Sequence, residues 1–237
     1  MAARRRYADP RDPVILSAAR TAMAAARASG TGLVGDISNT LVTVPLLREA
    51  RMPARVFYEL LGFNAGDPDG HVRAARAAID AVRGPEAGVR LSLAPHAPYS
   101  VSPGVFGALR ADLDAHPGDI STVHLAESVD EVEFLARGTG GWRELLGELG
   151  VWSSDWQPPG VSPVAYLADL GFLDARVLAV HGVQCRGDDL ARVRALGTTV
   201  VSCPRSNRYV GVGDPPLDLF YAAGVGVAFG TDSLASV

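Results

Sequence analysis

The sequence has little cysteine, no excess of positive charge and no long apolar run, and each shortage excludes a class of protein. Two cysteines among 237 residues, Cys185 and Cys203, are too few for a disulfide framework and indicate a reducing compartment. A formal net charge of −4 gives no positive field to hold a phosphate backbone, so nucleic acid is not expected as a partner. Apolar runs end at about ten residues, against the roughly 20 that a membrane-spanning helix needs, so we expect no membrane partner.

The first residues also lack the apolar segment of a secretory signal. Arg4, Arg5 and Arg6 are followed by polar residues and proline rather than by an apolar run. We interpret the basic triplet as a solvated chain end; the alternative is a phosphate-binding arm. Together with the scarcity of cysteine, these features predict a cytoplasmic protein.

Short apolar runs alternate with Ala-, Leu- and Arg-rich stretches of helical period, a rhythm typical of βα units and a parallel sheet. With 48% hydrophobic and 20% charged residues, the composition is that of an ordinary globular protein. Seven strands are predicted, at Gly32–Ile37, Arg55–Leu61, Val89–Leu93, Ser121–Leu125, Val177–Val180, Thr198–Ser202 and Val225–Phe229. Helices are predicted at Val14–Ala28, Pro45–Arg51, Asp69–Val82, Ser102–Ala115, Ser128–Ala136, Arg143–Leu149, Pro163–Leu170, Gly187–Leu196 and Pro216–Ala223. Because no linker or repeat divides the chain, we expect one domain over residues 1–237.

One stretch, Gly140 to Pro163, interrupts this rhythm and contains Trp142, Trp152 and Trp156. Long loops in such sheets often cover a ligand site, so these tryptophans are candidates for an aromatic wall. The alternative, which we favour, is packing within an irregular insertion.

Polar side chains stand at the carboxyl ends of five successive predicted strands, where open-sheet and barrel enzymes build their sites. These residues are His96, His124, His181, Asn207 and Asp232. A single histidine on an apolar strand is more often a core residue with its hydrogen bonds satisfied than a ligand. Three histidines and an aspartate at one edge, however, form a ligand inventory that suits zinc and leaves room for a water molecule.

Glu127, Glu59 and Asn207 can each be interpreted in two ways. Glu127 follows His124 by three residues, so we expect it on the first helical turn beyond the strand, where it would move protons to and from a metal-bound water. The alternative for Glu127 is a carboxylate favoured by the helix dipole, worth about 0.3–1 kcal/mol. Glu59 ends a strand and is a candidate substrate contact or a lining residue. Asn207, beside Ser206, is a candidate substrate contact or part of an Asx or Ser turn.

Five segments, in this order, carry a family resemblance: PHAPYS, HLAES with Glu131 downstream, VHG, CPRSN and AGVGVAFGTDSLAS. The chain resembles the amidohydrolase superfamily, and within it the branch of cyclic-amidine deaminases and chlorohydrolases that includes S-adenosylhomocysteine and guanine deaminases. The resemblance covers nearly the whole chain and is more specific for the superfamily than for the branch.

The resemblance implies a distorted (β/α)8 barrel, a TIM-type α/β fold, that holds one divalent metal and hydrolyses a C–N or C–Cl bond on a heteroaromatic ring. Zinc is favoured as the metal, and iron is served by the same ligands. By resemblance, His124 and Asp232 are metal ligands, and Asp232 also takes a proton from the nucleophilic water. His181 resembles the histidine beside that water, Glu127 the glutamate that protonates a ring nitrogen, and His96 a histidine that contacts the substrate.

One departure from the family pattern stands out. The family takes two metal ligands from a His-x-His pair on its first barrel strand, and the five histidines here contain no such pair. The seven predicted strands fit strands two to eight of the barrel, so we expect an incomplete barrel that is inactive alone.

The function predicted is that of a metal-dependent hydrolase that deaminates a purine-like or other nitrogen heterocycle through a metal-activated water. The alternatives are hydrolytic dechlorination or cyclic amide hydrolysis on the same barrel, or a metal-free remnant that only binds. The expected partner is a small heterocyclic substrate, and the oligomeric state stays open, a homo-oligomer included.

Overall fold

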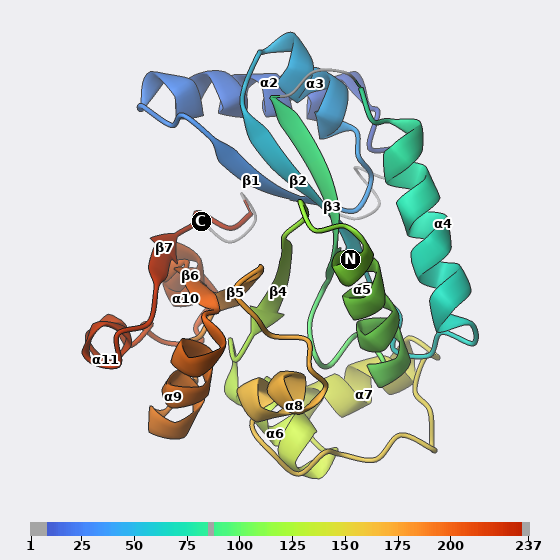
Figure 1. Ribbon diagram of the computed structural model, residues 1–237, viewed down its shortest axis with the longest axis vertical. Coiled ribbons are helices and arrows are strands. Elements are labelled where there is room, and N and C mark those ends of the chain that lie inside the picture. The colour runs from blue at the N-terminus through green and yellow to red at the C-terminus, as the bar shows by residue number, and fades with distance from the viewer. Residues whose placement is uncertain (1–8, 85–87, 234–237) are drawn as a thin grey trace. The chain divides into compact units, whose positions relative to one another are not determined.

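The computed structural model describes residues 9–84 and 88–233, so the basic triplet Arg4–Arg6 lies outside the described residues. The chain is grouped into two compact units. The first unit contains the chain up to Leu60 together with Arg73–Ala94, and the second contains Leu61–Val72 together with the chain from Pro95 onward. Helices and strands alternate through both units (Figure 1).

Seven strands and ten helices lie in the part of the chain that is described. The strands are β1 (Val34–Ser38), β2 (Ala54–Leu60), β3 (Val89–Pro95), β4 (Ser121–Leu125), β5 (Val177–His181), β6 (Thr199–Ser202) and β7 (Val227–Phe229). The helices are α2 (Pro13–Ala28), α3 (Thr43–Glu49), α4 (Pro68–Ala81), α5 (Pro103–Ala115), α6 (Val129–Arg137), α7 (Gly141–Glu148), α8 (Pro163–Asp169), α9 (Gly187–Leu196), α10 (Pro204–Val210) and α11 (Leu217–Ala222). All seven predicted strands and all nine predicted helices are present, most with shifted ends.

The first unit is built on a sheet of order β1-β2-β3, in which β1 and β2 run parallel with Val34 opposite Ala54. Its first helix, α2, begins where the Asp12 carboxylate accepts a hydrogen bond from the Val14 amide at 2.7 Å and Pro13 occupies the first turn. The core of the unit includes Val44, Val56 and Ile79, each fully buried.

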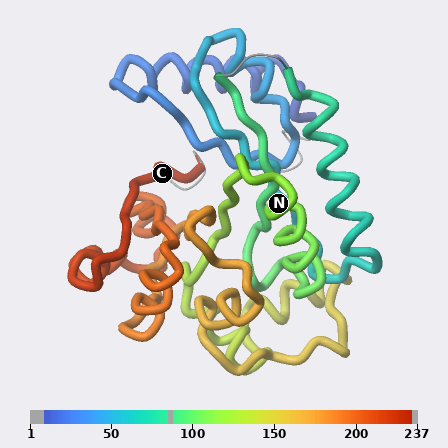
Figure 2. Tube along the Cα trace, in the orientation of Figure 1, coloured from blue at the N-terminus to red at the C-terminus, as the bar shows by residue number. Residues whose placement is uncertain are grey.

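The second unit is built on a sheet of order β4-β5-β6-β7, with all neighbouring strands parallel. The trace in Figure 2 passes from orange to red through β5, α9, β6, α10, α11 and β7 in turn. Because every pair is parallel, the carboxyl ends of β4 to β7 meet at one edge of the sheet. In the β4–β5 pair, His124 lies opposite Val180 and Leu125 opposite His181.

The interrupting stretch between β4 and β5 contains helix α7, and two of its tryptophans pack against phenylalanines. Trp156 stacks on Phe134 with ring centroids 4.5 Å apart, and Trp152 stacks on Phe63 at 5.8 Å. The favoured interpretation, packing within the insertion, describes these two residues. Trp142 instead stacks on Tyr99 at 3.8 Å.

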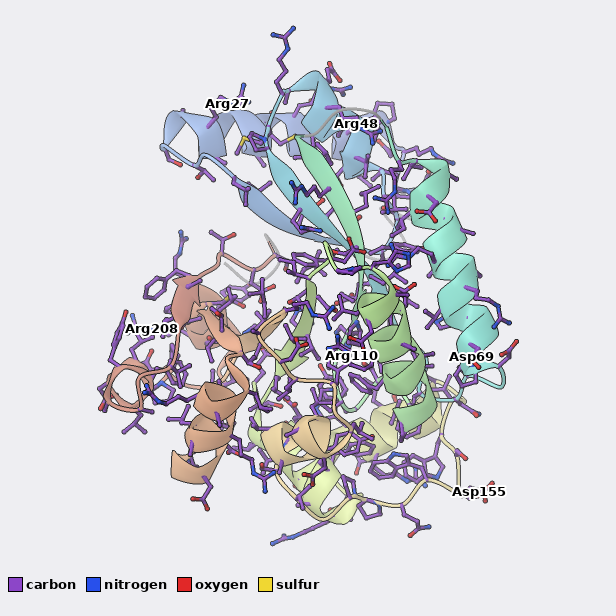
Figure 3. The ribbon with its side chains drawn as sticks, in the orientation of Figure 1. Arg27, Arg48, Asp69, Arg110, Asp155 and Arg208 are labelled. Carbon is purple, nitrogen blue, oxygen red and sulfur yellow. The ribbon has the colours of Figure 1, made fainter. Side chains whose placement is uncertain are left out.

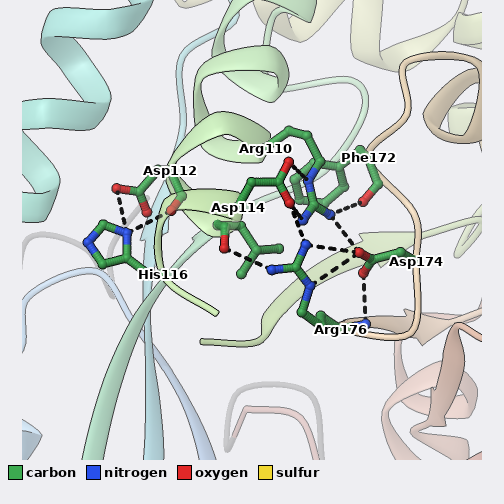
Figure 4. Close-up of polar contacts among 8 residues, drawn as sticks. Arg110, Asp112, Asp114, His116, Phe172, Asp174 and Arg176 are labelled. Carbon is green, nitrogen blue, oxygen red and sulfur yellow. Dashed lines mark hydrogen bonds and ion pairs between the residues drawn. The ribbon is translucent and has the colours of Figure 1, made fainter. Parts of the chain in front are cut away.

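An ion-pair network joins α5 to the segment before β5 (Figure 4). Asp114 accepts hydrogen bonds from Arg110 and Arg176, both at 2.5 Å, and Asp174 lies 3.1 Å from Arg110 and 3.2 Å from Arg176. The two arginines thus share two carboxylates, and the network anchors the amino end of β5.

One helix was not predicted from the sequence. Residues 204–210 form helix α10, so Ser206 and Asn207 lie in a helix and not in the Asx or Ser turn that was the alternative for Asn207. Pro204 begins the helix and Gly211, with a φ of 78°, ends it. In the described ranges, no helix is long and apolar enough to cross a membrane.

Candidate active site

Three histidines of the second unit lie side by side. His96 directly follows β3, His124 lies in β4 and His181 ends β5. The ring centroids of His96 and His124 are 5.1 Å apart, and those of His124 and His181 are 5.5 Å apart. The structure therefore brings together the three histidines that the sequence placed at strand ends.

Hydrogen bonds determine which nitrogen of His124 and His96 carries the hydrogen. Nδ1 of His124 lies 2.9 Å from the carbonyl oxygen of His96, and because a carbonyl only accepts, Nδ1 is the donor. Nδ1 of His96 lies 2.6 Å from Oγ of Ser100, whose own hydrogen is donated to the carbonyl of Ala97 at 3.1 Å. Nδ1 of His96 is therefore also a donor. Nδ1 of each ring is thus engaged, and in metal sites the ligating atom of such a histidine is Nε2.

A second cluster is formed by Glu127, His181 and Asp232, whose ligand atoms all lie within 4.8 Å of one another. Oε1 of Glu127 is 3.6 Å from Nε2 of His181, with side-chain exposures of 22% and 1%. Two of these residues adopt backbone conformations that side chains rarely take: φ is 80° at His181 and 58° at Asp232. Backbone strain of this kind, of order 1–3 kcal/mol each, persists only where the surrounding contacts hold it.

The environment shifts the pKa values of the three groups in different directions. Burial raises the pKa of Glu127, opposed by the nearby His124. Burial, with the neighbouring His124, lowers the pKa of His181 to about 4. Burial disfavours the charged form of Asp232, but the hydrogen bond from Ser206 and the proximity of His181 lower its pKa below the ordinary value. The cluster thus combines a carboxyl group that retains its proton more readily, a neutral imidazole and an ionised carboxylate, a division of roles typical of acid–base sites.

The structure corrects the position of Glu127. This residue lies between β4 and α6, before the helix cap Ser128, and not on the first helical turn as predicted. Its backbone is held by Glu131, whose carboxylate accepts hydrogen bonds from the amides of Ala126 (3.0 Å) and Glu127 (2.9 Å). Glu131 is fully buried, and burial raises the pKa of its side chain to about 8. Its role was missed in the sequence, although the S-x-x-E spacing of Ser128 and Glu131 is the signature of a capping box.

Two neighbouring residues of α10 hold the last two members of the cluster. Oγ of Ser206 donates to Oδ2 of Asp232 at 2.5 Å, and Nδ2 of Asn207 lies 3.0 Å from Nδ1 of His181. Both Ser206 and Asn207 are fully buried. Arg208, labelled on the same helix in Figure 3, is exposed and pairs with Asp214 at 2.5 Å.

The remaining predicted residue, Glu59, lies in β2 of the first unit. Its Oε2 accepts a hydrogen bond from Nδ2 of Asn39 at 2.9 Å. The substrate contacts predicted for His96, Glu59 and Asn207 stay predictions.

The residues of the second unit fit a divalent metal. Nδ1 of His124 is engaged by a backbone carbonyl, the arrangement in which a histidine ligates through Nε2. Asp232 provides an ionised carboxylate, and one of its oxygens, an oxygen of Glu127 and a ring nitrogen of His181 lie within 4.8 Å of one another. Imidazole and carboxylate ligands suit zinc and, with the same donor atoms, iron.

Comparison with known proteins shows the family and the fold. The model of the Amidohydrolase family matches residues 15–237. The chain is 37% identical over 215 residues to the aminodeoxyfutalosine deaminase of Deinococcus radiodurans, which covers 87% of this chain and 51% of that protein. The crystal structure of the aminofutalosine deaminase of Helicobacter pylori in complex with methylthio-coformycin has a TM-score of 0.81 at 26% identity, covering 92% of this chain and 52% of that one.

A zinc-bound adenosine deaminase from Xanthomonas campestris shares the fold, with a TM-score of 0.71 at 24% identity over 93% of this chain and 45% of that one. The chain thus spans about half the length of the relatives that it matches. These likenesses confirm the predicted fold class, the α/β barrel fold of metal-dependent hydrolases present over part of its length.

Proposed function

The chain belongs to the amidohydrolase family, and on that premise we propose that it provides the acid–base residues of a metal-dependent aminohydrolase that acts on a purine-like heterocycle. The observation that carries this proposal is the convergence of Glu127, His181 and Asp232 within 4.8 Å, beside the ring of His124. The similarity to the deaminase of Deinococcus radiodurans supports deamination as the reaction.

In this reaction the oxygen of a water molecule bonds to the ring carbon that bears the amino group, and the bond from that carbon to the amino nitrogen breaks to release ammonia. Asp232, ionised, accepts a proton from the attacking water. Glu127, whose pKa is raised by burial, donates a proton to the ring nitrogen. It then takes up the remaining proton of the added hydroxyl group as the carbonyl forms and passes it to the departing amine. The proton held by Asp232 returns to Glu127, so that one water molecule supplies both hydrogens and both carboxyl groups regain their starting states. His181, neutral and buried, presents a polar ring atom beside both carboxyl groups.

His124 and Asp232 are the proposed metal ligands, and zinc is the proposed ion. A divalent ion held there would supply positive charge that lowers the pKa of a water molecule toward neutrality. His96, whose Nδ1 is held by Ser100, is proposed to contact the substrate.

The test combines metal content with product analysis. The chain is purified after zinc supplementation, and its zinc is measured by elemental analysis beside the variants His124→Ala and Asp232→Asn. Ammonia release from 6-aminopurine nucleosides and chloride release from chlorinated triazines are then measured on the same preparations. Glu127→Gln is included because it removes the proton donor and leaves both proposed ligands in place.

We expect zinc to bind to the chain and to be lost in both ligand variants, and any ammonia release to disappear in Glu127→Gln. Zinc bound equally by all variants would refute the ligand assignment. Ammonia release that survives in Glu127→Gln would refute the proton donor, and release of chloride without ammonia would establish dechlorination as the reaction. A chain that binds no zinc would refute the proposal that these residues hold the metal by themselves.

A further inference from the structure

Helix α10 holds both residues of the cluster that have an unusual backbone. His181 and Asp232 have φ values of 80° and 58°, and each is hydrogen-bonded by one of two adjacent residues of the helix. Ser206 and Asn207 are themselves fully buried, so neither is displaced by solvent. A strained conformation needs contacts that hold it, and this helix provides one such contact for each residue.

The backbone of Asn207 is fixed at both sides. Its amide donates to the carbonyl of Cys203 at 3.0 Å, and its carbonyl accepts from the amide of Val212 at 3.1 Å, where the chain leaves the helix. The side chain therefore meets His181 from a rigid position, as a group must if it is to orient a ring.

The contact also determines which ring nitrogen of His181 carries the hydrogen. Nδ2 of Asn207 is a donor, so Nδ1 of His181 accepts and the single hydrogen of the neutral ring stays on Nε2. Nε2 faces the carboxyl group of Glu127 at 3.6 Å, and Asp232 belongs to the same cluster. If the amide were turned so that Oδ1 accepted from Nδ1, the lone pair of Nε2 would lie in the same cluster as the ionised carboxylate of Asp232, an unfavourable arrangement. The contacts of Nδ1 and of Nε2 thus favour the same tautomer of His181, with the hydrogen on Nε2.

We propose that Asn207 is a positioning residue that keeps the hydrogen of His181 on Nε2, directed at the reacting centre. His181 then differs from His96 and His124, whose Nδ1 atoms donate. The protein thereby divides three neighbouring histidines into two that donate through Nδ1 and one that donates through Nε2. The catalytic meaning of this division rests on the proposed function, whereas the tautomer of His181 does not.

The experiment measures the tautomer of His181 by NMR. The histidine side chains of the 15N-labelled chain, treated with a chelator, are observed in a long-range proton–nitrogen correlation spectrum, in which a protonated ring nitrogen and one with a lone pair are clearly separated. The His181 signals are assigned with His181→Gln. The decisive variant is Asn207→Asp, which keeps the shape of the side chain but replaces the donor with acceptors only. Asn64→Asp, at an exposed asparagine of the same unit, is the matched control.

We expect the hydrogen of His181 on Nε2 in the unmodified chain and in the control, and on Nδ1 in Asn207→Asp. In Asn207→Ala, which removes the donor, we expect both tautomers to be populated. A hydrogen on Nδ1 in the unmodified chain overturns the proposal, even if neither variant folds. An unchanged tautomer of His181 in Asn207→Asp also overturns the proposal. If that variant in addition binds the substrate more weakly, Asn207 is a substrate contact instead. Zinc bound equally by the unmodified chain and the ligand variants refutes the proposed function alone, because the spectrum is recorded without metal or substrate.

Discussion

Replacing Glu131 with glutamine should change how the stability of the protein depends on pH. The carboxyl group is fully buried, and burial raises its pKa from the usual 4.5 to about 8. Below pH 4.5 the group is protonated in the folded and the unfolded chain, and its contribution to stability is fully present. As the pH rises to about 8, the unfolded chain ionises first, so stability is lost across this window.

One pKa unit corresponds to about 1.4 kcal/mol, so this shift of about 3.5 units changes the free energy of unfolding by at most about 5 kcal/mol. Glutamine does not titrate. Its side-chain NH2 group, however, meets one of the two backbone N–H groups that donate to the carboxyl group of Glu131, and that backbone donor loses its acceptor. The loss costs about 1–3 kcal/mol of stability at every pH. The unmodified chain should therefore be more stable than Glu131→Gln at pH 4.5 and lose that advantage by pH 8.

Urea unfolding followed by tryptophan fluorescence, repeated across this pH range, measures the difference. Glu133→Gln, at an exposed position of the same helix, is the control and should give a curve parallel to that of the unmodified chain. A difference between the unmodified chain and Glu131→Gln that stays constant with pH would show that Glu131 is ionised in the folded protein throughout, contrary to the reasoning.

Three further predictions concern packing, charge and the cluster. Phe134→Ala should lower the free energy of unfolding by about 3–5 kcal/mol in urea titrations, because the ring is fully buried against tryptophans. The control Val129→Ala, at an exposed position of the same helix, should change it little, and equal effects of the two substitutions would contradict this. Arg110 lowers the pKa of Asp114 to about 2. The stability that this carboxylate adds, relative to Asp114→Asn, should therefore be present above pH 3.8, fall as the pH approaches 2 and shrink in 1 M salt. A stability difference that changes with neither pH nor salt would contradict this. Ser206→Ala should raise the pKa of Asp232 in an NMR titration of the chelator-treated chain, and an unchanged pKa would show that Ser206 does not stabilise the ionised form.

The sequence predicted the strands well because a sheet covered on both faces requires continuous apolar runs. The bounds of β4 and α9 agree with the prediction at both ends. At β7 the prediction began two residues early, because the amide of the buried Val225 bonds to the carbonyl of Phe220 and so closes helix α11. Helix α10 was missed because its polar sequence, PRSNRYV, has no apolar period, and its buried side chains are satisfied by residues far away in the sequence.

The position of the site was predictable, but its hydrogen bonds were not. His124 lies near the end of β4, His181 ends β5 and Asp232 follows β7, and parallel pairing in this sheet brings such residues to one edge. His96 follows β3, a strand of the other sheet, so pairing alone does not place it. Nothing local in the sequence indicates which nitrogen of each ring carries the hydrogen, because that depends on a carbonyl, a hydroxyl or an amide supplied by another element. The burial of Glu131 is likewise a property of the packed unit rather than of its capping motif.

The strand order β4-β5-β6-β7 follows the order of the chain, and this has a consequence for how the protein is made. During synthesis each new strand emerges beside the edge that its predecessor has left open, so the sheet can grow in one direction without waiting for distant segments. The histidines would take their places first, followed by the two residues of α10. Asp232 would arrive last, behind a three-residue strand whose last two residues are exposed. The nascent chain would therefore place its histidines before it acquires the carboxylate proposed to accept the proton of water.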